Sequence, residues 1–257
     1  MDLQLSVIQS DIVWENIDEN LDRFSEKIEA VPNESQLIIL PELFATGFSM
    51  QPGKFAARAA RQINRMKEFA KRKQAVIVGS IIAENKNQFF NRLIWMNPNE
   101  TFQHYDKRHL FSFAGEDKHY TAGESKLITA INEWNIRPLI CYDLRFPVWS
   151  RNTGDYHLLI YIANWPERRS SAWKTLLKAR AIENQSYVVG VNRVGKDGNG
   201  ILHSGNSVII DPKGNTTAAC KTGSEEIISA SIKYKELNTF RKKFPALNDA
   251  DNFYLKP

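Results

Sequence analysis

Apolar residues along the first half of this chain recur with two different periods. Leu3, Leu5 and Val7 alternate with polar residues, which is typical of a half-buried strand. Over about residues 14–30 the apolar positions recur every three or four residues instead, and this spacing predicts an amphipathic helix. The same reasoning predicts further strands at 37–40, 75–82, 89–96 and 101–105, and a helix over about 54–73.

The second half of the chain repeats this order of elements. A Gly-rich stretch at 195–200, which we interpret as a loop, precedes a closing set of strands. Helices that cover only one face of each sheet leave the other two faces to pack together. The pattern therefore predicts an α/β fold, a four-layer α-β-β-α sandwich with a pseudo-twofold axis. The predicted elements are strands near 127–130, 136–141, 157–162 and 187–192, helices near 147–153 and 170–184, strands near 208–210, 215–219 and 226–231, and a last helix over about 233–243.

The composition favours one domain and a small, anionic partner. No linker rich in Pro, Gly or Ser interrupts the 257 residues, so we expect a single domain over residues 1–257. The net charge of +5 comes from dispersed basic residues, so nucleic acid is not an expected partner. A modest positive field suits small anionic substrates, because it steers anions toward the protein.

The sequence gives no sign of a membrane or export segment. No apolar stretch approaches the length of a transmembrane helix, and the N-terminus begins directly with a strand pattern. We therefore expect neither a membrane partner nor a signal peptide. The two cysteines, Cys141 and Cys220, do not make a disulfide framework, so the cytoplasm is the expected compartment. Cys220 lies in a Thr- and Ala-rich segment and is interpreted as a packing residue.

Cys141 is the strongest candidate for chemistry. It ends the apolar run that begins near residue 136, and Asp143 and Pro147 are typical of the start of a helix. A thiol at a strand-to-helix turn is held on rigid backbone, and the free N–H groups there favour a thiolate and can bind an oxyanion. Considered alone, Cys141 could equally be a buried core residue.

Two other predicted strand ends carry residues with complementary chemistry. Glu42 follows the apolar run 37–40, and catalytic groups of α/β sheets gather at such ends. Its apolar neighbours should raise its pKa, as a general base requires. Lys107 follows another short predicted strand, at 101–105, among aromatic residues. Taken singly, Glu42 could be a solvated turn residue and Lys107 part of a surface basic cluster.

The three segments together resemble the Glu–Lys–Cys triad of the nitrilase superfamily, the carbon–nitrogen hydrolases. The resemblance covers nearly the whole chain, and that superfamily's fold is the sandwich predicted above. The pattern is most similar to the bacterial ω-amidase (2-oxoglutaramate amidase) branch. The motifs are Pro-Glu at 41–42, Phe-Ala-Thr-Gly-Phe at 44–48, Asp-Lys-Arg-His-Leu-Phe at 106–111, Cys-Tyr-Asp-Leu-Arg-Phe-Pro at 141–147, Ala-Asn-Trp-Pro at 163–166, Ala-Arg-Ala-Ile-Glu-Asn at 179–184, Asn-Arg at 192–193 and Phe-Pro-Ala at 244–246.

The resemblance implies roles for the triad and its neighbours. The sulfur of Cys141 attacks the substrate carbonyl, and Glu42 accepts the thiol proton. The ammonium of Lys107 and the backbone N–H of Tyr142 stabilise the oxyanion.

The family also has a second glutamate, which orients the substrate amide and the lysine. Glu116 resembles this residue. Glu124 is a competing candidate, and the spacing before His119 and Tyr120 favours Glu116. An exposed loop acid is the alternative interpretation of Glu116.

A dicarboxylate monoamide also needs a cation for its distal carboxylate. Arg193 is our first candidate, because it ends a predicted strand as the triad residues do. Arg145 comes next and could instead brace the turn after Cys141, and Arg168 is a weaker candidate. Further candidates for contact with the substrate are Phe48, Asn164 and Trp165, of which Trp165 could equally be core packing.

The implied activity is hydrolysis of the terminal amide of 2-oxoglutaramate or 2-oxosuccinamate, by a homodimer without cofactor. No metal is expected, because the five histidines show no paired ligand spacing. A nitrilase or an N-carbamoyl hydrolase would use the same triad and remains an alternative. A glutaminase subunit with a separate synthetase partner is another. A binding protein on an inactive hydrolase scaffold would be expected to lack a triad member, and this chain lacks none.

Overall fold

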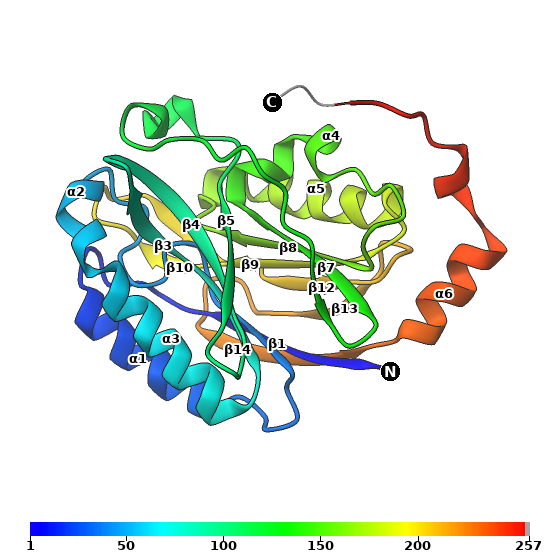
Figure 1. Ribbon diagram of the computed structural model, residues 1–257, viewed down its shortest axis with the longest axis horizontal. Coiled ribbons are helices and arrows are strands. Elements are labelled where there is room, and N and C mark those ends of the chain that lie inside the picture. The colour runs from blue at the N-terminus through cyan, green and yellow to red at the C-terminus, as the bar shows by residue number, and fades with distance from the viewer. Residues whose placement is uncertain (255–257) are drawn as a thin grey trace.

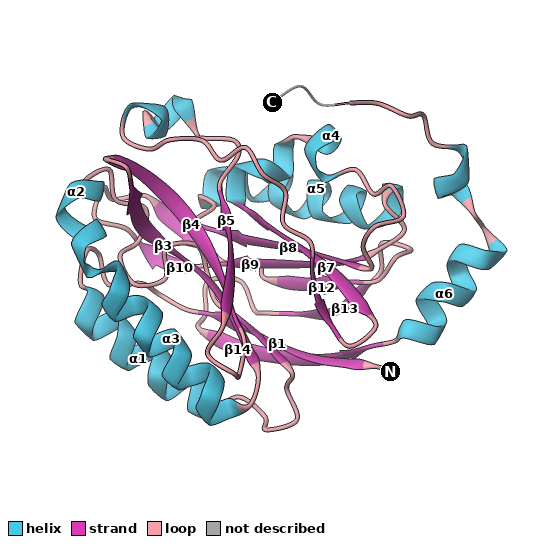
Figure 2. Ribbon diagram, in the orientation of Figure 1, coloured by secondary structure: helices cyan, strands magenta, loops and turns pink. Residues whose placement is uncertain are grey.

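The computed structural model describes residues 1–254 and contains two six-stranded sheets (Figures 1 and 2). The strands of the first sheet are β1 (Leu3–Gln9), β2 (Leu37–Ile39), β3 (Val76–Asn85), β4 (Gln88–Met96), β5 (Phe102–Asp106) and β14 (Glu226–Ile232). The strands of the second sheet are β6 (Thr129–Ile131), β7 (Trp134–Ile140), β8 (Leu158–Ala163), β9 (Tyr187–Asn192), β12 (Val208–Ile210) and β13 (Thr216–Ala219).

The pairing of strands confirms the predicted pseudo-twofold relation. The sheets have the orders β14-β1-β2-β3-β4-β5 and β6-β7-β8-β9-β12-β13. In each sheet three central strands are parallel, namely β1, β2 and β3 in the first and β7, β8 and β9 in the second. An antiparallel strand flanks these three on one side and two antiparallel strands extend the sheet on the other.

The helices cover the outer faces of the two sheets (Figure 1). Helices α1 and α3 lie side by side on the first sheet, and α5 packs on the second. The side chain of Asn16 fixes the start of α1, because its oxygen accepts a hydrogen bond from the N–H of Glu19 at 3.3 Å. The helices are α1 (Ile17–Glu29), α2 (Pro52–Phe55), α3 (Ala59–Lys73), α4 (Pro147–Ser150), α5 (Ser170–Glu183) and α6 (Tyr234–Lys243).

Two hydrophobic layers explain why the sandwich is stable. Successive residues of a strand point to opposite faces, so Val76 and Val78 of β3 join the core between the sheets while Ile77 joins the core beneath α1 and α3. The inner core also contains Trp134 from β7, which is fully buried. Each such side chain contributes about 1.5–3 kcal/mol when fully buried. The predicted α-β-β-α layering is therefore confirmed.

Three predicted elements differ from the structure. The helix predicted near 147–153 ends at Ser150, because the backbone of Arg151 is extended. The helix predicted over 54–73 is divided into α2, a 3-10 turn at Ala56–Arg58, and α3. The Gly-rich stretch at 195–200 is part of a hairpin, β10 (Val194–Lys196) and β11 (Leu202–Ser204), in which Gly195 and Gly200 have φ of +83° and +77°.

Within residues 1–254, no helix has both the length and the apolar character that crossing a bilayer requires.

Candidate active site

The predicted catalytic residues follow the carboxyl ends of three strands, two in the first sheet and one in the second. Glu42 comes shortly after β2, Lys107 directly after β5 and Cys141 directly after β7. Cys141 has a φ of +43°, a left-handed conformation that is strained for a residue with a Cβ. It begins a 3-10 helix that ends at Arg145. The strand and this turn therefore fix the backbone that carries the thiol.

Glu42 is completely buried and held by three donors. Its Oε1 accepts hydrogen bonds from Asn91 Nδ2 at 2.8 Å and from Lys107 Nζ at 3.0 Å. Its Oε2 accepts the backbone N–H of Asn164 at 2.7 Å, and the Asn164 side chain returns a hydrogen bond to the carbonyl of Glu42 at 2.6 Å. Asn164 thus joins the end of β8 to the Glu42 carboxylate.

A second buried carboxylate, Glu116, holds Lys107 from the other side. Lys107 Nζ lies 2.9 Å from both carboxylate oxygens of Glu116, and the N–H of Phe111 donates to the same carboxylate at 2.6 Å. The competing candidate Glu124 is exposed. Of the two candidates, Glu116 is therefore the one whose carboxylate contacts Lys107.

Burial and charge set the protonation states of these groups. Burial lowers the pKa of Lys107, but the carboxylates of Glu116 and Glu42 outweigh it and raise the pKa, so the amine remains an ammonium. Burial raises the pKa of Glu116 despite the opposing charge of Lys107. Burial and then the charge of Glu42 raise the pKa of the Cys141 thiol well above its usual range.

The raised pKa of Cys141 corrects one expectation. The turn was expected to favour a thiolate, but desolvation of the thiol and the negative charge of Glu42 raise its pKa instead. The resting thiol is therefore neutral, and its activation requires a base. Tyr142 is the second residue of the turn, where a backbone N–H has no partner within the helix and can bind an oxyanion.

A cavity of about 260 Å³ contains Lys107 and Cys141 in its lining. The predicted contact residues Phe48, Tyr142, Asn164 and Trp165 also line it, as do Arg145 and Arg168. Lys107 Nζ lies 5.0 Å from the centre of the Phe48 ring. Trp165 lines the cavity and also belongs to the core, because the centre of its ring lies 5.4 Å from that of Trp173.

Arg193, the first candidate for binding a distal carboxylate, is placed elsewhere. Its side chain is fully buried, and its Nη2 pairs with Asp11 at 2.6 Å and donates to the carbonyl of Ile12 at 3.1 Å. Among the described residues that line the cavity, Arg193 does not appear. Asp11, just after the end of β1, already neutralises the Arg193 guanidinium. The expectation that Arg193 binds the distal carboxylate is therefore corrected.

Sequence reasoning missed Arg169, which lines the cavity beside Arg168. Its guanidinium lies 5.0 Å from the ring centre of Phe111 and 5.3 Å from that of Phe113. Its Nη1 is buried and, among residues 1–254, has no hydrogen-bond partner. Burial, then the charges of Arg168 and Arg145, lower the pKa of Arg169. An adjacent pair of arginines after Trp-Pro was the only available signal in the sequence.

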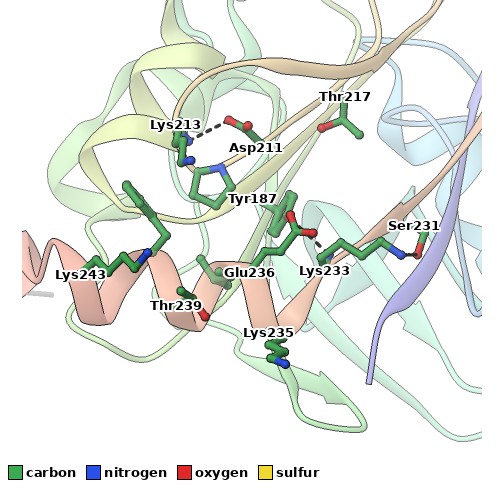
Figure 3. Close-up of a pocket in the computed structure, with 13 residues that line it drawn as sticks. Tyr187, Asp211, Lys213, Thr217, Ser231, Lys233, Lys235, Glu236, Thr239 and Lys243 are labelled. Atoms are coloured by element: carbon green, nitrogen blue, oxygen red, sulfur yellow. Dashed lines mark hydrogen bonds between the residues drawn. The ribbon is translucent and has the colours of Figure 1, made fainter.

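A larger cavity, of about 510 Å³, lies beside α6 (Figure 3). It is lined by lysines, but Lys233 Nζ already contacts Asp2 at 2.8 Å and Ser231 at 3.1 Å. None of the predicted catalytic residues is among the described residues that line it. Size alone therefore does not identify the reactive site. The lysines of this cavity are Lys213, Lys233, Lys235 and Lys243.

In the part of the chain that the structure describes, no three His, Cys, Asp or Glu side chains converge as metal ligands would. His109 instead binds the carboxylate of Asp143, with Nδ1 2.7 Å from Oδ1.

Comparison with known proteins adds to this geometry. The family model described as carbon-nitrogen hydrolase matches residues 4–242. The chain is 42% identical to the omega-amidase YafV of Escherichia coli strain K12, over 98% of both chains. It is 32% identical to the 2-oxoglutaramate amidase of Bacillus subtilis, over 95% of this chain and 96% of the relative.

Solved structures resemble the whole molecule. XC1258 from Xanthomonas campestris, described as a CN-hydrolase superfamily protein with an arsenic adduct in its active site, superimposes with a TM-score of 0.97 at 39% identity and covers 100% of both chains. Nit3 of Saccharomyces cerevisiae superimposes with a TM-score of 0.86 at 22% identity, covering 95% of this chain and 94% of its own. At that identity the second likeness shows the fold alone.

Proposed function

Because this chain belongs to the carbon–nitrogen hydrolase family, we propose that it is an amidase that hydrolyses the terminal amide of small dicarboxylate monoamides. The substrates are compounds such as 2-oxoglutaramate and 2-oxosuccinamate, and the products are the dicarboxylate and ammonia. One observation carries the proposal: a single cavity is lined by Lys107 and Cys141 and also by three arginines. The relatives named omega-amidase and 2-oxoglutaramate amidase support it.

The first half of the reaction forms a thioester. The Cys141 sulfur attacks the amide carbon while its proton passes to Glu42, because the neutral thiol needs a base. The negative charge on the carbonyl oxygen is stabilised by the ammonium of Lys107 and the N–H of Tyr142. When the tetrahedral intermediate collapses, the carbon–nitrogen bond breaks and Glu42 gives its proton to the departing ammonia.

The second half of the reaction uses the same groups on water. Glu42 removes a proton from water, the resulting oxygen attacks the thioester carbon, and the carbon–sulfur bond breaks. The proton returns to the Cys141 sulfur, and the carboxylic acid leaves and ionises. Glu116 keeps the Lys107 ammonium aimed at the cavity through its two hydrogen bonds of 2.9 Å.

Arg169 is the residue we propose for the distal carboxylate. Its buried Nη1 has no partner among the described residues, and the neighbouring charges of Arg168 and Arg145 are not offset by a salt bridge there. A carboxylate bound at this position would satisfy the free N–H and relieve the repulsion between the guanidinium groups. The rings of Phe111 and Phe113 hold the guanidinium in one orientation.

The proposal is tested by ammonia release from a panel of ω-amides, nitriles and carbamoyl compounds. We expect kcat/KM for succinamate to exceed that for butyramide, a neutral amide of the same length, by tenfold or more. A charge-assisted hydrogen bond contributes about 1.5–3 kcal/mol, which corresponds to about one to two decades. Equal values would defeat the ω-amidase assignment and leave a carbon–nitrogen hydrolase of other specificity. Faster turnover of nitriles or carbamoyl compounds would identify the alternative activities.

The variant Arg169→Gln is expected to erase most of the preference for the charged substrate. The kcat/KM for succinamate should fall at least tenfold, whereas that for butyramide should stay within about twofold, because the glutamine removes the charge but not the reacting groups. Arg168→Gln is the matched control, since Arg168 is exposed and should have the smaller effect. An equal loss on both amides in Arg169→Gln would show a general, not a charge-specific, role.

We further infer that the enzyme is a homodimer of the cytoplasm. The likeness to the family supports the dimer, and so do exposed apolar side chains on the outer helices, among them Val148 and Ile182, each 49% exposed. Sedimentation at micromolar concentration should give twice the chain mass of 29.5 kDa. A particle of the chain mass at all concentrations would contradict the dimer.

A further inference from the structure

Asp143 lies two residues after Cys141 and is completely buried. Four donors surround its carboxylate. Oδ2 accepts the backbone N–H of Ile140 at 3.0 Å and the hydroxyl of Tyr105 at 2.8 Å. Oδ1 accepts the backbone N–H of His109 at 3.0 Å and contacts His109 Nδ1 at 2.7 Å. The carboxylate therefore has one donor for each of its lone-pair directions.

These donors come from two sheets that meet at the site. Ile140 ends β7, in the sheet that carries Cys141, while Tyr105 belongs to β5, in the sheet that carries Lys107 (Figure 1). Tyr105 precedes Lys107 by two residues and His109 follows it by two. A single side chain beside the nucleophile thus contacts the chain on both sides of Lys107.

We propose that Asp143 is a positioning residue that sets the distance between the Cys141 sulfur and the Lys107 ammonium. This inference rests on the proposed function, because it concerns the same reaction. The two groups act on one substrate carbonyl, Cys141 on its carbon and Lys107 on its oxygen. A shift of about 1 Å between them can cost about a hundredfold in rate. Asp143 is absent from the described cavity lining, so it acts through these neighbours and does not touch the substrate.

The surroundings of Asp143 leave its partners little freedom. The Tyr105 oxygen also accepts Trp149 Nε1 at 3.0 Å and the N–H of Arg108 at 3.2 Å. The His109 ring stacks on Phe146 with centres 3.8 Å apart. Tyr105 and His109 therefore hold fixed positions, and they transmit the position of Asp143 to the segment between them.

An asparagine at this position keeps the shape but not the hydrogen bonding. Its amide offers one acceptor oxygen and one NH₂ group, so in either orientation the NH₂ faces a backbone N–H, that of Ile140 or that of His109, which then has no acceptor. Buried donors left without acceptors destabilise their local arrangement. The segment that carries Lys107 would then shift relative to Cys141, while the arginines of the cavity would remain in place.

The experiment compares Asp143→Asn with the wild type on succinamate. We expect kcat to fall ten- to a hundredfold while KM stays within about threefold, because the reacting groups are misaligned and the carboxylate site is untouched. Asp106→Asn is the matched control. Asp106 also neighbours Lys107, but it pairs with Arg92 at 2.7 and 2.8 Å and does not share the partners of Asp143, so its kcat should change less than threefold. An unchanged kcat in Asp143→Asn overturns the inference.

A second variant separates positioning from a general loss of stability. Tyr105→Phe removes one hydroxyl and keeps the buried ring, so it should fold even if Asp143→Asn does not. Its kcat should fall at least threefold with little change in KM, and an unchanged kcat overturns the inference. In the double variant the two losses should not multiply, because both act through one network. Multiplicative losses, measured where circular dichroism shows all variants folded, would also overturn it.

The activity of the wild type on succinamate separates a failure of the positioning role of Asp143 from a failure of the substrate assignment. If the wild type hydrolyses succinamate and the Asp143 variant equals it, only the positioning role fails. If the wild type hydrolyses a different amide or a nitrile better, the substrate assignment fails, and the same comparison of kcat and KM is then made on that substrate.

Discussion

Replacing Cys141 with alanine is expected to lower kcat by about four orders of magnitude or more, because loss of a covalent nucleophile removes the chemical step itself. Alanine keeps the Cβ that the strained backbone at φ +43° already accommodates, so the fold should persist. Ammonia release measures kcat, and thermal unfolding measures stability. Mass spectrometry should detect a substrate-derived thioester on the wild type and none on Cys141→Ala.

Cys220→Ala is the matched control for this result. Cys220 is also a free thiol, and it is buried whereas Cys141 is half-buried, but it belongs neither to the cavity lining nor to the network around Lys107, as far as the described residues extend. Its kcat should stay within about twofold of the wild type, because no catalytic group depends on it. Turnover of Cys141→Ala near the wild-type rate would refute the assignment of the nucleophile.

The sequence was most informative where function depends on backbone position. The ends of predicted strands made Glu42, Lys107 and Cys141 candidates, because short-range pattern determines where a strand stops, and the resemblance to the family's triad joined them. The layer arrangement followed from the same pattern, since helices on one face oblige the opposite faces to meet. Both kinds of inference need only the order of elements, which a single sequence contains.

The sequence was least informative where function depends on which way a long side chain extends. Arg193 ends a strand, as expected, but Asp11 from a distant part of the chain pairs with it. Arg169 becomes a candidate only because Phe111 and Phe113 lie against it and its Nη1 has no partner within residues 1–254. Such partners are long-range in sequence, so no local period indicates them.

The charge state of Cys141 also depended on distant residues. A turn with free N–H groups favours a thiolate, and the local sequence predicts such a turn at Cys141. Burial and the carboxylate of Glu42 act in the opposite direction and prevail, because a low-dielectric surrounding disfavours the charged form. The consequence is mechanistic: the base has to act during the reaction, not before it.

Lys107→Met is expected to remove activity and to change how stability depends on pH. The ammonium supplies stabilisation of the oxyanion, and removing one such group costs about 10²–10³ in kcat. Its loss also leaves Glu42 and Glu116 buried together without their shared cation. Burial already raises the pKa of Glu116 while Lys107 lowers it, so without Lys107 the pKa should rise further.

The sign of the pH effect follows from proton binding. With its pKa raised, the folded variant keeps a proton that the unfolded chain releases above its ordinary pKa of about 4.3. Stability therefore falls as pH rises, by up to about 1.4 kcal/mol per pH unit for each such proton, until the pH passes the folded-state pKa. Thermal unfolding of Lys107→Met should give a Tm that decreases from pH 5.5 to pH 8 more steeply than in the wild type.

Lys73→Met separates this effect from the loss of any buried lysine. Lys73 is also buried, but its Nζ donates to the carbonyl of Val31 at 2.7 Å and to Asn33 Oδ1 at 2.9 Å, which are neutral partners. Its removal should lower Tm by a similar amount at both pH values and leave kcat nearly unchanged, because no carboxylate gains a proton. A pH profile of Lys107→Met parallel to that of Lys73→Met would mean that Glu42 and Glu116 are not electrostatically linked to Lys107, and the proposed roles of all three residues would then have to be abandoned.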